Sequence, residues 1–210
     1  MSGCCHDTSC APGDAPDPRF RRALWIALAI NAAMFIVEMI SGLFAHSVSL
    51  QADALDFLGD SANYVLTLMV LSMSMRWRSG AALVKGATMG LFGFWVIGQT
   101  FWNLYYGTLP GAFVMGSIGF LALIANVTSA GLLYAFRSGN ANMRSVWLCS
   151  RNDAIGNVAV MLAAGGVFSL GTAWPDLMVA MVMAGLALSS STLIMRQAIA
   201  ELRSAAMAAE

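Results

Sequence analysis

Long apolar runs alternate with short polar breaks along most of the chain. Each run is long enough to cross the apolar core of a bilayer as a helix, which takes about 20 residues. The runs cover residues 23–44, 49–75, 81–106, 112–136, 142–170 and 174–199. Turn-forming residues at 78–80, 107–111 and 138–140 separate three pairs of neighbouring runs. The pattern predicts an all-α membrane protein with six transmembrane helices.

Composition indicates that lipid is the solvent for most of the chain. Hydrophobic residues fill 59% of its 210 positions and charged residues 10%, against roughly 45–50% and about 25% in soluble domains. A chain of this size cannot bury so much apolar surface within itself. This excludes a large soluble catalytic domain, a disulfide-stapled secreted module and a disordered chain. The formal net charge of zero argues against nucleic acid as a partner.

The two ends of the chain differ from its middle. Residues 1–20 are small, polar and rich in proline, which predicts a disordered tail, and they lack the basic start and apolar core of a signal peptide. Residues 21–203 make up the predicted six-helix membrane domain. Residues 204–210 would form only a short C-terminal tail, so we expect no soluble domain there.

Basic residues indicate the orientation in the membrane. All of them except Arg151 fall on one side of a six-helix arrangement, whereas an odd number of helices would scatter them over both sides. They are Arg19, Arg21 and Arg22 before the first helix, Arg76, Arg78 and Lys85 around the second connection, Arg137 and Arg144 around the fourth, and Arg196 and Arg203 at the end of the last helix. The positive-inside rule makes that side cytoplasmic. We therefore expect both termini in the cytoplasm and the helices in the inner membrane of the cell.

Charged residues inside the predicted helices mark the candidate chemistry. Each costs about 2.5–3.5 kcal/mol at the centre of a lipid-facing helix, so such residues usually face a protein interior and mark an ion or proton path. They are Glu38, Asp53, Asp56, Asp60, Arg151 and Asp153. Structural pairing of Glu38 with Arg151 is the alternative, but one arginine cannot neutralise five acids. The aspartates of the second helix need another cation.

The spacing of these residues predicts where they meet. At about 100° per residue, Asp53, Asp56 and Asp60 form a stripe about 60° wide, and Cys149 and Asp153 are one turn apart on the fifth helix. At about 1.5 Å per residue, Asp56 and Asp60 lie about 10–16 Å deep from one membrane face, and Cys149 and Asp153 lie about as deep from the other. The two helices are therefore expected to bring them together near the midplane of a core about 30 Å thick.

Asp56, Asp60, Cys149 and Asp153 would offer three oxygens and one sulfur to a cation. Zn²⁺ accepts such a tetrahedral set, and a thiolate adds affinity for the softer Cd²⁺, whereas Mg²⁺ gains nothing from sulfur. A buried cysteine is more often a small hydrophobe, but its i, i+4 spacing to an aspartate favours a ligand. Without metal the crowded acids must hold protons, which an arriving metal displaces. We therefore expect proton antiport with export of the metal, and Asp53, one turn outward, could relay the ion or a proton.

Three segments resemble the cation diffusion facilitator family. Residues 47–60, SVSLQADALDFLGD, are similar to its second-helix signature, in which an Asp or His and an Asp four residues later bind the transported metal. Residues 148–153, LCSRND, fall where its fifth helix carries a His or Asp and a further Asp, and Trp174-Pro175-Asp176 fits the start of its sixth helix. Over residues 20–203 the resemblance implies a six-helix transporter of divalent metal, usually Zn²⁺ and often Cd²⁺, that exchanges the metal for protons and needs no cofactor.

The sequence departs from the family pattern in three places. Cys149 stands where histidine is usual, and no histidine-rich loop fits between residues 136 and 141. We also expect no counterpart of the cytoplasmic metal-binding domain that often dimerises these proteins. We therefore expect a short form whose homodimer, where one forms, uses the transmembrane helices. Gly86 and Gly90 have a spacing that allows close helix approach, although this spacing is common by chance.

The N-terminal tail contains a second candidate metal motif. Cys4, Cys5, His6 and Cys10 form a CCHxxxC cluster, and thiols stay reduced in the cytoplasm. The cluster could bind Zn²⁺ or Cd²⁺ near the entrance to the transport site, and the alternative is an idle disordered tail. His46, the other histidine, is expected to be a solvated residue of the connection between the first two helices.

Two other classes of function stay open. An intramembrane aspartyl enzyme needs two facing aspartates, one acid and one base, but this gives no reason for Asp60 and Cys149 to complete two i, i+4 pairs. A membrane metal sensor that does not transport would need an output domain, which we do not expect here. Measurement of metal flux in proteoliposomes separates transporter, enzyme and sensor.

Overall fold

The computed structural model describes the backbone of residues 18–69, 75–136 and 141–207, and the side chains of these ranges except 75–76, 78, 141–152 and 204–207. Within these ranges the chain forms six α-helices and no strand. The helices are α1 (Pro18–Phe44), α2 (Val48–Met69), α3 (Met75–Tyr106), α4 (Ala112–Tyr134), α5 (Ala141–Leu170) and α6 (Trp174–Met207). The predicted all-α fold is confirmed.

Three helices extend beyond the apolar runs that predict them. α1 begins at Pro18, α3 begins at Met75, and α6 continues to Met207. The added turns are rich in residues such as Arg, Ala and Glu that favour helix in water, so hydropathy marks the end of the apolar segment and not the end of the helix. Residues 18–20, which the sequence assigns to the tail, are therefore helical. Pro18 occupies the first turn, where its missing N–H costs nothing.

Five of the six described helices are long and apolar enough to cross a membrane. The exception is α2, which has 22 residues and carries three aspartates. More than half of its residues are buried, and it contacts α1, α3, α5 and α6. The surrounding helices thus shield α2 from lipid. Without them, α2 would be too polar to lie in the membrane.

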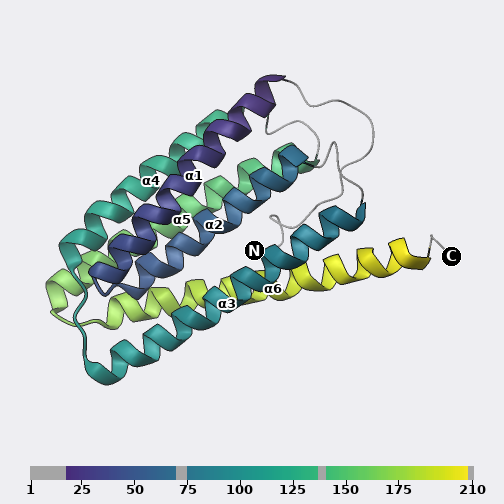
Figure 1. The fold of residues 1–210 in the computed structure, drawn as a ribbon. Helices are drawn as coiled ribbons and strands as arrows, with labels where there is room; N and C mark the ends of the chain where they lie inside the picture. Colours follow the sequence, from purple (N-terminus) through teal and green to yellow (C-terminus); the bar gives the residue numbers. More distant parts are fainter. Residues whose placement is uncertain (1–17, 70–74, 137–140, 208–210) are drawn as a thin grey trace.

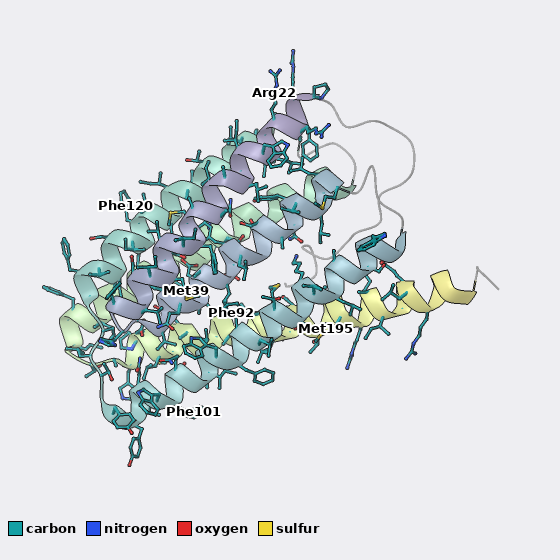
Figure 2. All side chains as sticks on the ribbon, in the orientation of Figure 1. Arg22, Met39, Phe92, Phe101, Phe120 and Met195 are labelled. Atoms are coloured by element: carbon teal, nitrogen blue, oxygen red, sulfur yellow. The ribbon has the colours of Figure 1, made fainter. Side chains whose placement is uncertain are left out.

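Large apolar side chains cover the outside of the molecule. Phe44, Phe113 and Phe168 are each more than 80% exposed. Phe101 and Phe120 also point away from the helix bundle (Figure 2), and both are exposed. Exposed aromatic surface of this extent is unfavourable in water and is the surface that lipid would cover.

The helices form two groups that meet at one end of the molecule and diverge towards the other (Figure 1). One group is a bundle of α1, α2, α4 and α5, and the other is the pair α3 and α6, which lie side by side. α2 also contacts both helices of the pair and so joins the two groups. The connections α1–α2, α3–α4 and α5–α6 all lie at the end where the groups meet.

Glycines allow α3 and α6 to pack closely. A Cβ atom built on Gly86, Gly90 or Gly93 of α3 would lie 2.7–3.0 Å from a side-chain atom of α6. The Oγ of Ser191 on α6 donates a 2.6 Å hydrogen bond to the carbonyl of Gly86. Small residues on one face let helix backbones approach and pack in this way. The glycine spacing noted in the sequence therefore serves contact within one chain.

Asp176, in the first turn of α6, ties the two groups together where they meet. Its carboxylate accepts hydrogen bonds from the hydroxyls of Ser47 and Ser49, at 2.7 and 2.5 Å, and from the backbone N–H groups of Val48 and Ser49, at 2.8 and 3.1 Å. Asp176 is fully buried. It therefore caps the N-terminus of α2 from another helix and fixes where α2 begins.

Candidate metal centre

The three aspartates of α2 lie along one side of the helix, as their spacing predicts. Asp53 and Asp60 are buried, with 1% and 5% of their surface exposed, and Asp56 is half-buried between them. The helices packed around α2 thus enclose carboxylates that would otherwise face lipid. A buried carboxylate needs hydrogen bonds or a cation to compensate the loss of water.

A buried tyrosine holds one of these carboxylates. The hydroxyl of Tyr64 donates a 2.8 Å hydrogen bond to Oδ2 of Asp60, one turn earlier on the same helix. Tyr64 is itself fully buried and packs against Phe20 and Leu133. Because this ring has little freedom, the hydrogen bond fixes the direction of the Asp60 carboxylate.

Asp153 brings a carboxyl from α5 to the acidic side of α2. It lies close enough to Asp60 for the two carboxyls to share a hydrogen bond, and Asp56 and Asp53 also act on it electrostatically. The carboxyls of Asp60 and Asp153 thus approach each other from α2 and α5, and the metal site predicted around them stays a prediction. Among the described side chains, no three His, Cys, Asp or Glu residues are gathered closely enough to hold a metal ion. The three aspartates alone therefore do not form a complete ligand set.

Several predicted site residues lie outside the described side chains. Cys149 and Arg151 belong to α5, whose backbone is helical over this stretch, but their side chains are not described. The tail residues Cys4, Cys5, His6 and Cys10 precede the described chain. The fourth ligand, the pairing of Glu38 with Arg151 and the tail cluster therefore stay predictions.

A second carboxyl pair lies beside the α2 aspartates. Glu38 of α1 is fully buried and lies within hydrogen-bonding reach of Asp53. Both carboxyl oxygens of Glu38 and Oδ2 of Asp53 accept no hydrogen bond from any N–H or O–H group of the described residues. Two such carboxyls are stable together only when they share a proton or a cation. Glu38 thus extends the acidic side of α2 onto α1.

Comparison with known proteins establishes the family. Residues 24–203 match the family described as the cation efflux transmembrane domain. The chain belongs to the cation efflux family. Members of this family are transporters and not enzymes, which removes the intramembrane aspartyl enzyme from the alternatives. The resemblance to cation diffusion facilitators is confirmed.

The cation efflux domain is similar to bacterial metal transporters. It is 23% identical over 184 residues to the cadmium, cobalt and zinc/H(+)-K(+) antiporter of Bacillus subtilis, covering 81% of this chain and 59% of that protein. It is 26% identical over 181 residues to the metal cation efflux system protein CzcD of Cupriavidus metallidurans, covering 77% and 55%. It is 26% identical over 198 residues to the zinc transporter ZitB of Yersinia pestis, covering 86% and 62%. The matched region thus spans little more than half the length of these relatives.

Sequence reasoning misses three polar residues of the cation efflux domain that lie near Asp60 or Asp153. Tyr64 stands four residues after Asp60, a spacing that could have identified it. Asn157, one turn after Asp153 on α5, has its amide 3.2 Å from that of buried Asn126 on α4, and no sequence signal indicates this contact. Lys85, which the sequence groups with the cations of a connection, lies well inside α3.

Proposed function

We propose that this cation efflux domain exports divalent metal, Zn²⁺ and Cd²⁺, from the cytoplasm through a site between α2 and α5. The observation that carries the proposal is the approach of the Asp60 and Asp153 carboxyls inside a membrane-spanning bundle. Two carboxylates brought together away from water need a cation or a proton between them. Relatives named as zinc, cadmium and cobalt transporters favour a divalent metal as that cation.

The ligands proposed for the metal are Asp56, Asp60, Cys149 and Asp153. The first two stand one turn apart on α2, and the last two stand one turn apart on α5. Three oxygens and a thiolate sulfur suit the tetrahedral coordination of Zn²⁺ and the softer Cd²⁺. No resident cofactor is needed, because the metal itself is the cargo.

Movement of the two helix groups against each other would give alternating access. The site lies on α2, which belongs to the bundle and also contacts both helices of the pair. The groups diverge at the end of the molecule where α1 begins and α6 ends (Figure 1), and these helix ends carry Arg19, Arg21, Arg22 and Arg203. By the positive-inside rule this end faces the cytoplasm, so the metal would enter from there. Rocking of one helix group against another around a fixed site is a common transport mechanism.

Proton antiport follows from the same carboxyls. In the absence of metal the buried acids hold protons, and a metal that binds them must displace those protons. Once the site faces outward, external protons would compete for the same ligands and release the ion. The carboxyl pair of Glu38 and Asp53 would hold a further proton beside the site. One curated relative is named as an H(+)-K(+) antiporter of cadmium, cobalt and zinc, which supports the coupling to a counter-ion.

The first test measures metal flux in proteoliposomes that contain purified wild type, Asp60→Ala or Asp153→Ala. Each variant removes one proposed ligand, so we expect Zn²⁺ flux to fall by at least about a hundredfold while the protein still inserts. Glu201→Ala is a matched control, because it removes an acid near the end of α6, where it accepts hydrogen bonds from Ser79 and Gln197. Flux at the wild-type rate in either variant would remove that residue from the site. Zn²⁺ binding without flux in the wild type would favour the metal sensor.

A further inference from the structure

Lys85 is the only lysine of the 210-residue chain, and it lies inside a membrane-spanning helix. It stands ten residues after the start of α3 at Met75 and six residues into the apolar span Ser79–Tyr106. A cation at this depth is costly unless an acid compensates its charge. The residues that face the ammonium therefore indicate its role.

The ammonium of Lys85 points across to the acidic side of α2. It donates a hydrogen bond to Oδ1 of Asn63, and the charge of Asp60 acts on it. Asn63 follows Asp60 by three residues, so the two lie on neighbouring positions of the same helix face. A lysine that only reached for water would extend along its own helix to the membrane surface. Lys85 instead crosses to the helix that carries the aspartates.

This placement supplies a cation for one of the α2 aspartates. With no metal bound, the ammonium offsets negative charge at Asp60, the aspartate whose charge acts on it. A divalent ion that binds Asp60 would come under the influence of the same ammonium, because the charges of Asp60 and Lys85 act on each other. The two positive charges also repel each other in a medium of low dielectric constant. The ammonium therefore weakens metal binding at the site.

We propose that Lys85 is a tethered counter-ion that sets the metal affinity of the transport site. This rests on the proposed function, because it takes Asp60 as a ligand of the transported metal. A transporter has to release its ion as well as bind it, and a site that binds too tightly turns over slowly. Lys85 lowers affinity and thereby raises the rate of release. It acts as a positioning residue on the charge of the site and is not itself a metal ligand.

A merely structural role for Lys85 makes a different prediction. In that case its hydrogen bond to Asn63 would hold α3 against α2, and the charge would not matter. Lys85→Gln retains a hydrogen-bond donor near Asn63 and removes the charge. Lys85→Arg retains the charge and alters the hydrogen bond. The two substitutions therefore separate charge from contact.

The experiment compares wild type, Lys85→Gln, Lys85→Met and Lys85→Arg in nanodiscs and in proteoliposomes. Titration calorimetry gives the Kd for Zn²⁺, and uptake gives KM and the maximal rate. We expect both neutral variants to bind Zn²⁺ about tenfold more tightly or better, because a nearby positive charge is lost. They should also show a lower KM and a lower maximal rate. Lys85→Arg should keep the wild-type Kd, as should Arg196→Gln, which removes a positive charge from an exposed position of α6.

An unchanged or weaker Kd in Lys85→Gln would overturn the counter-ion role, and this variant decides the question even where Lys85→Met fails to insert. Asp60→Asn in the same assays separates this failure from failure of the proposed function. If Asp60→Asn loses Zn²⁺ binding while Lys85→Gln and Lys85→Met keep the wild-type Kd, only the role of Lys85 is rejected. Full binding and flux in Asp60→Asn rejects the transport site itself, and the counter-ion role with it.

Discussion

Asp60 is held in place by residues from three parts of the chain. Tyr64 donates a hydrogen bond to it from the next turn of α2, Asp153 approaches it from α5, and the ammonium of Lys85 on α3 acts on its charge. The direction of a ligand is usually set by such surrounding contacts, and their loss weakens metal binding even where the ligand remains. The affinity of the proposed site therefore depends on the packing of α3 and α5 against α2.

At the scale of single residues, Cys149 is predicted to set the balance between Cd²⁺ and Zn²⁺. Thiolate is a soft ligand and Cd²⁺ is softer than Zn²⁺, so loss of the sulfur should weaken Cd²⁺ more. Imidazole suits Zn²⁺ and can complete a tetrahedron. We expect Cys149→His to keep Zn²⁺ transport and lower the Cd²⁺/Zn²⁺ uptake ratio about tenfold. Cys149→Ser should weaken transport of both ions, and of Cd²⁺ more strongly.

Competitive uptake of both ions measures this ratio, in vesicles that hold equal amounts of each protein. Ser150→Ala is a suitable control, because it changes a neighbouring position of α5 without removing sulfur. An uptake ratio that is the same in wild type, Cys149→His and Cys149→Ser would make Cys149 a packing residue. The site would then have only three protein ligands.

At the scale of elements, hydropathy predicts the existence of the helices better than their ends or their neighbours. The six apolar runs each became a helix, but α6 continues to Met207 because helix propensity persists where apolarity stops. α2 is the least apparent from apolarity alone, since its stability in the membrane comes from burial by other helices. Periodicity could place the α2 aspartates on one side of a helix. It could not reveal that Glu38 would face Asp53 or that Lys85 would face Asp60, because such contacts depend on how separate helices pack.

The N-terminal start of α2 depends on Asp176 of α6, which gives a second prediction. Asp176→Ala would leave the hydroxyls of Ser47 and Ser49 and two buried N–H groups without their acceptor. Loss of a helix cap and of buried hydrogen bonds costs about 2 kcal/mol or more. We expect the unfolding temperature in detergent to fall by roughly 4–8 °C and the maximal transport rate to fall with it.

Asp176→Asn keeps one acceptor oxygen, so its unfolding temperature should lie between those of wild type and Asp176→Ala. Differential scanning fluorimetry of the three proteins, at equal concentration, measures the order. If Asp176→Ala unfolds at the wild-type temperature, the hydrogen bonds to Asp176 do not hold α2 against α6, and another contact must join the two helix groups where they meet.

At the scale of the whole molecule, the two helix groups are packed by different means. Glycines of α3 allow close contact with α6, so this pair can move as one unit. The pair meets the four-helix bundle chiefly through α2, at whose N-terminus Asp176 provides a fixed point. Movement about this point would change the distance between the pair and the proposed site, because the two groups diverge away from Asp176 (Figure 1). Lys85 lies on the α3 side of that boundary and the aspartates lie on the α2 side, so the counter-ion would separate from the site or approach it as the groups move.

The N-terminal tail is the part of the molecule that transport is expected to need least. The proposed ligands lie in α2 and α5, and α1 begins at Pro18, so removal of residues 2–16 leaves the six described helices intact. Terminal segments of this kind usually tolerate deletion. We expect the deletion to keep the maximal Zn²⁺ flux within about twofold of wild type, with an effect only on the apparent affinity through loss of Cys4, Cys5, His6 and Cys10.

A full-length variant with these four residues changed to serine or alanine is the control that separates loss of the cluster from loss of the segment. Complete loss of flux in a correctly inserted deletion, with normal flux in that control, would assign the tail an essential role other than metal capture. Loss in both would make the cluster part of the transport pathway.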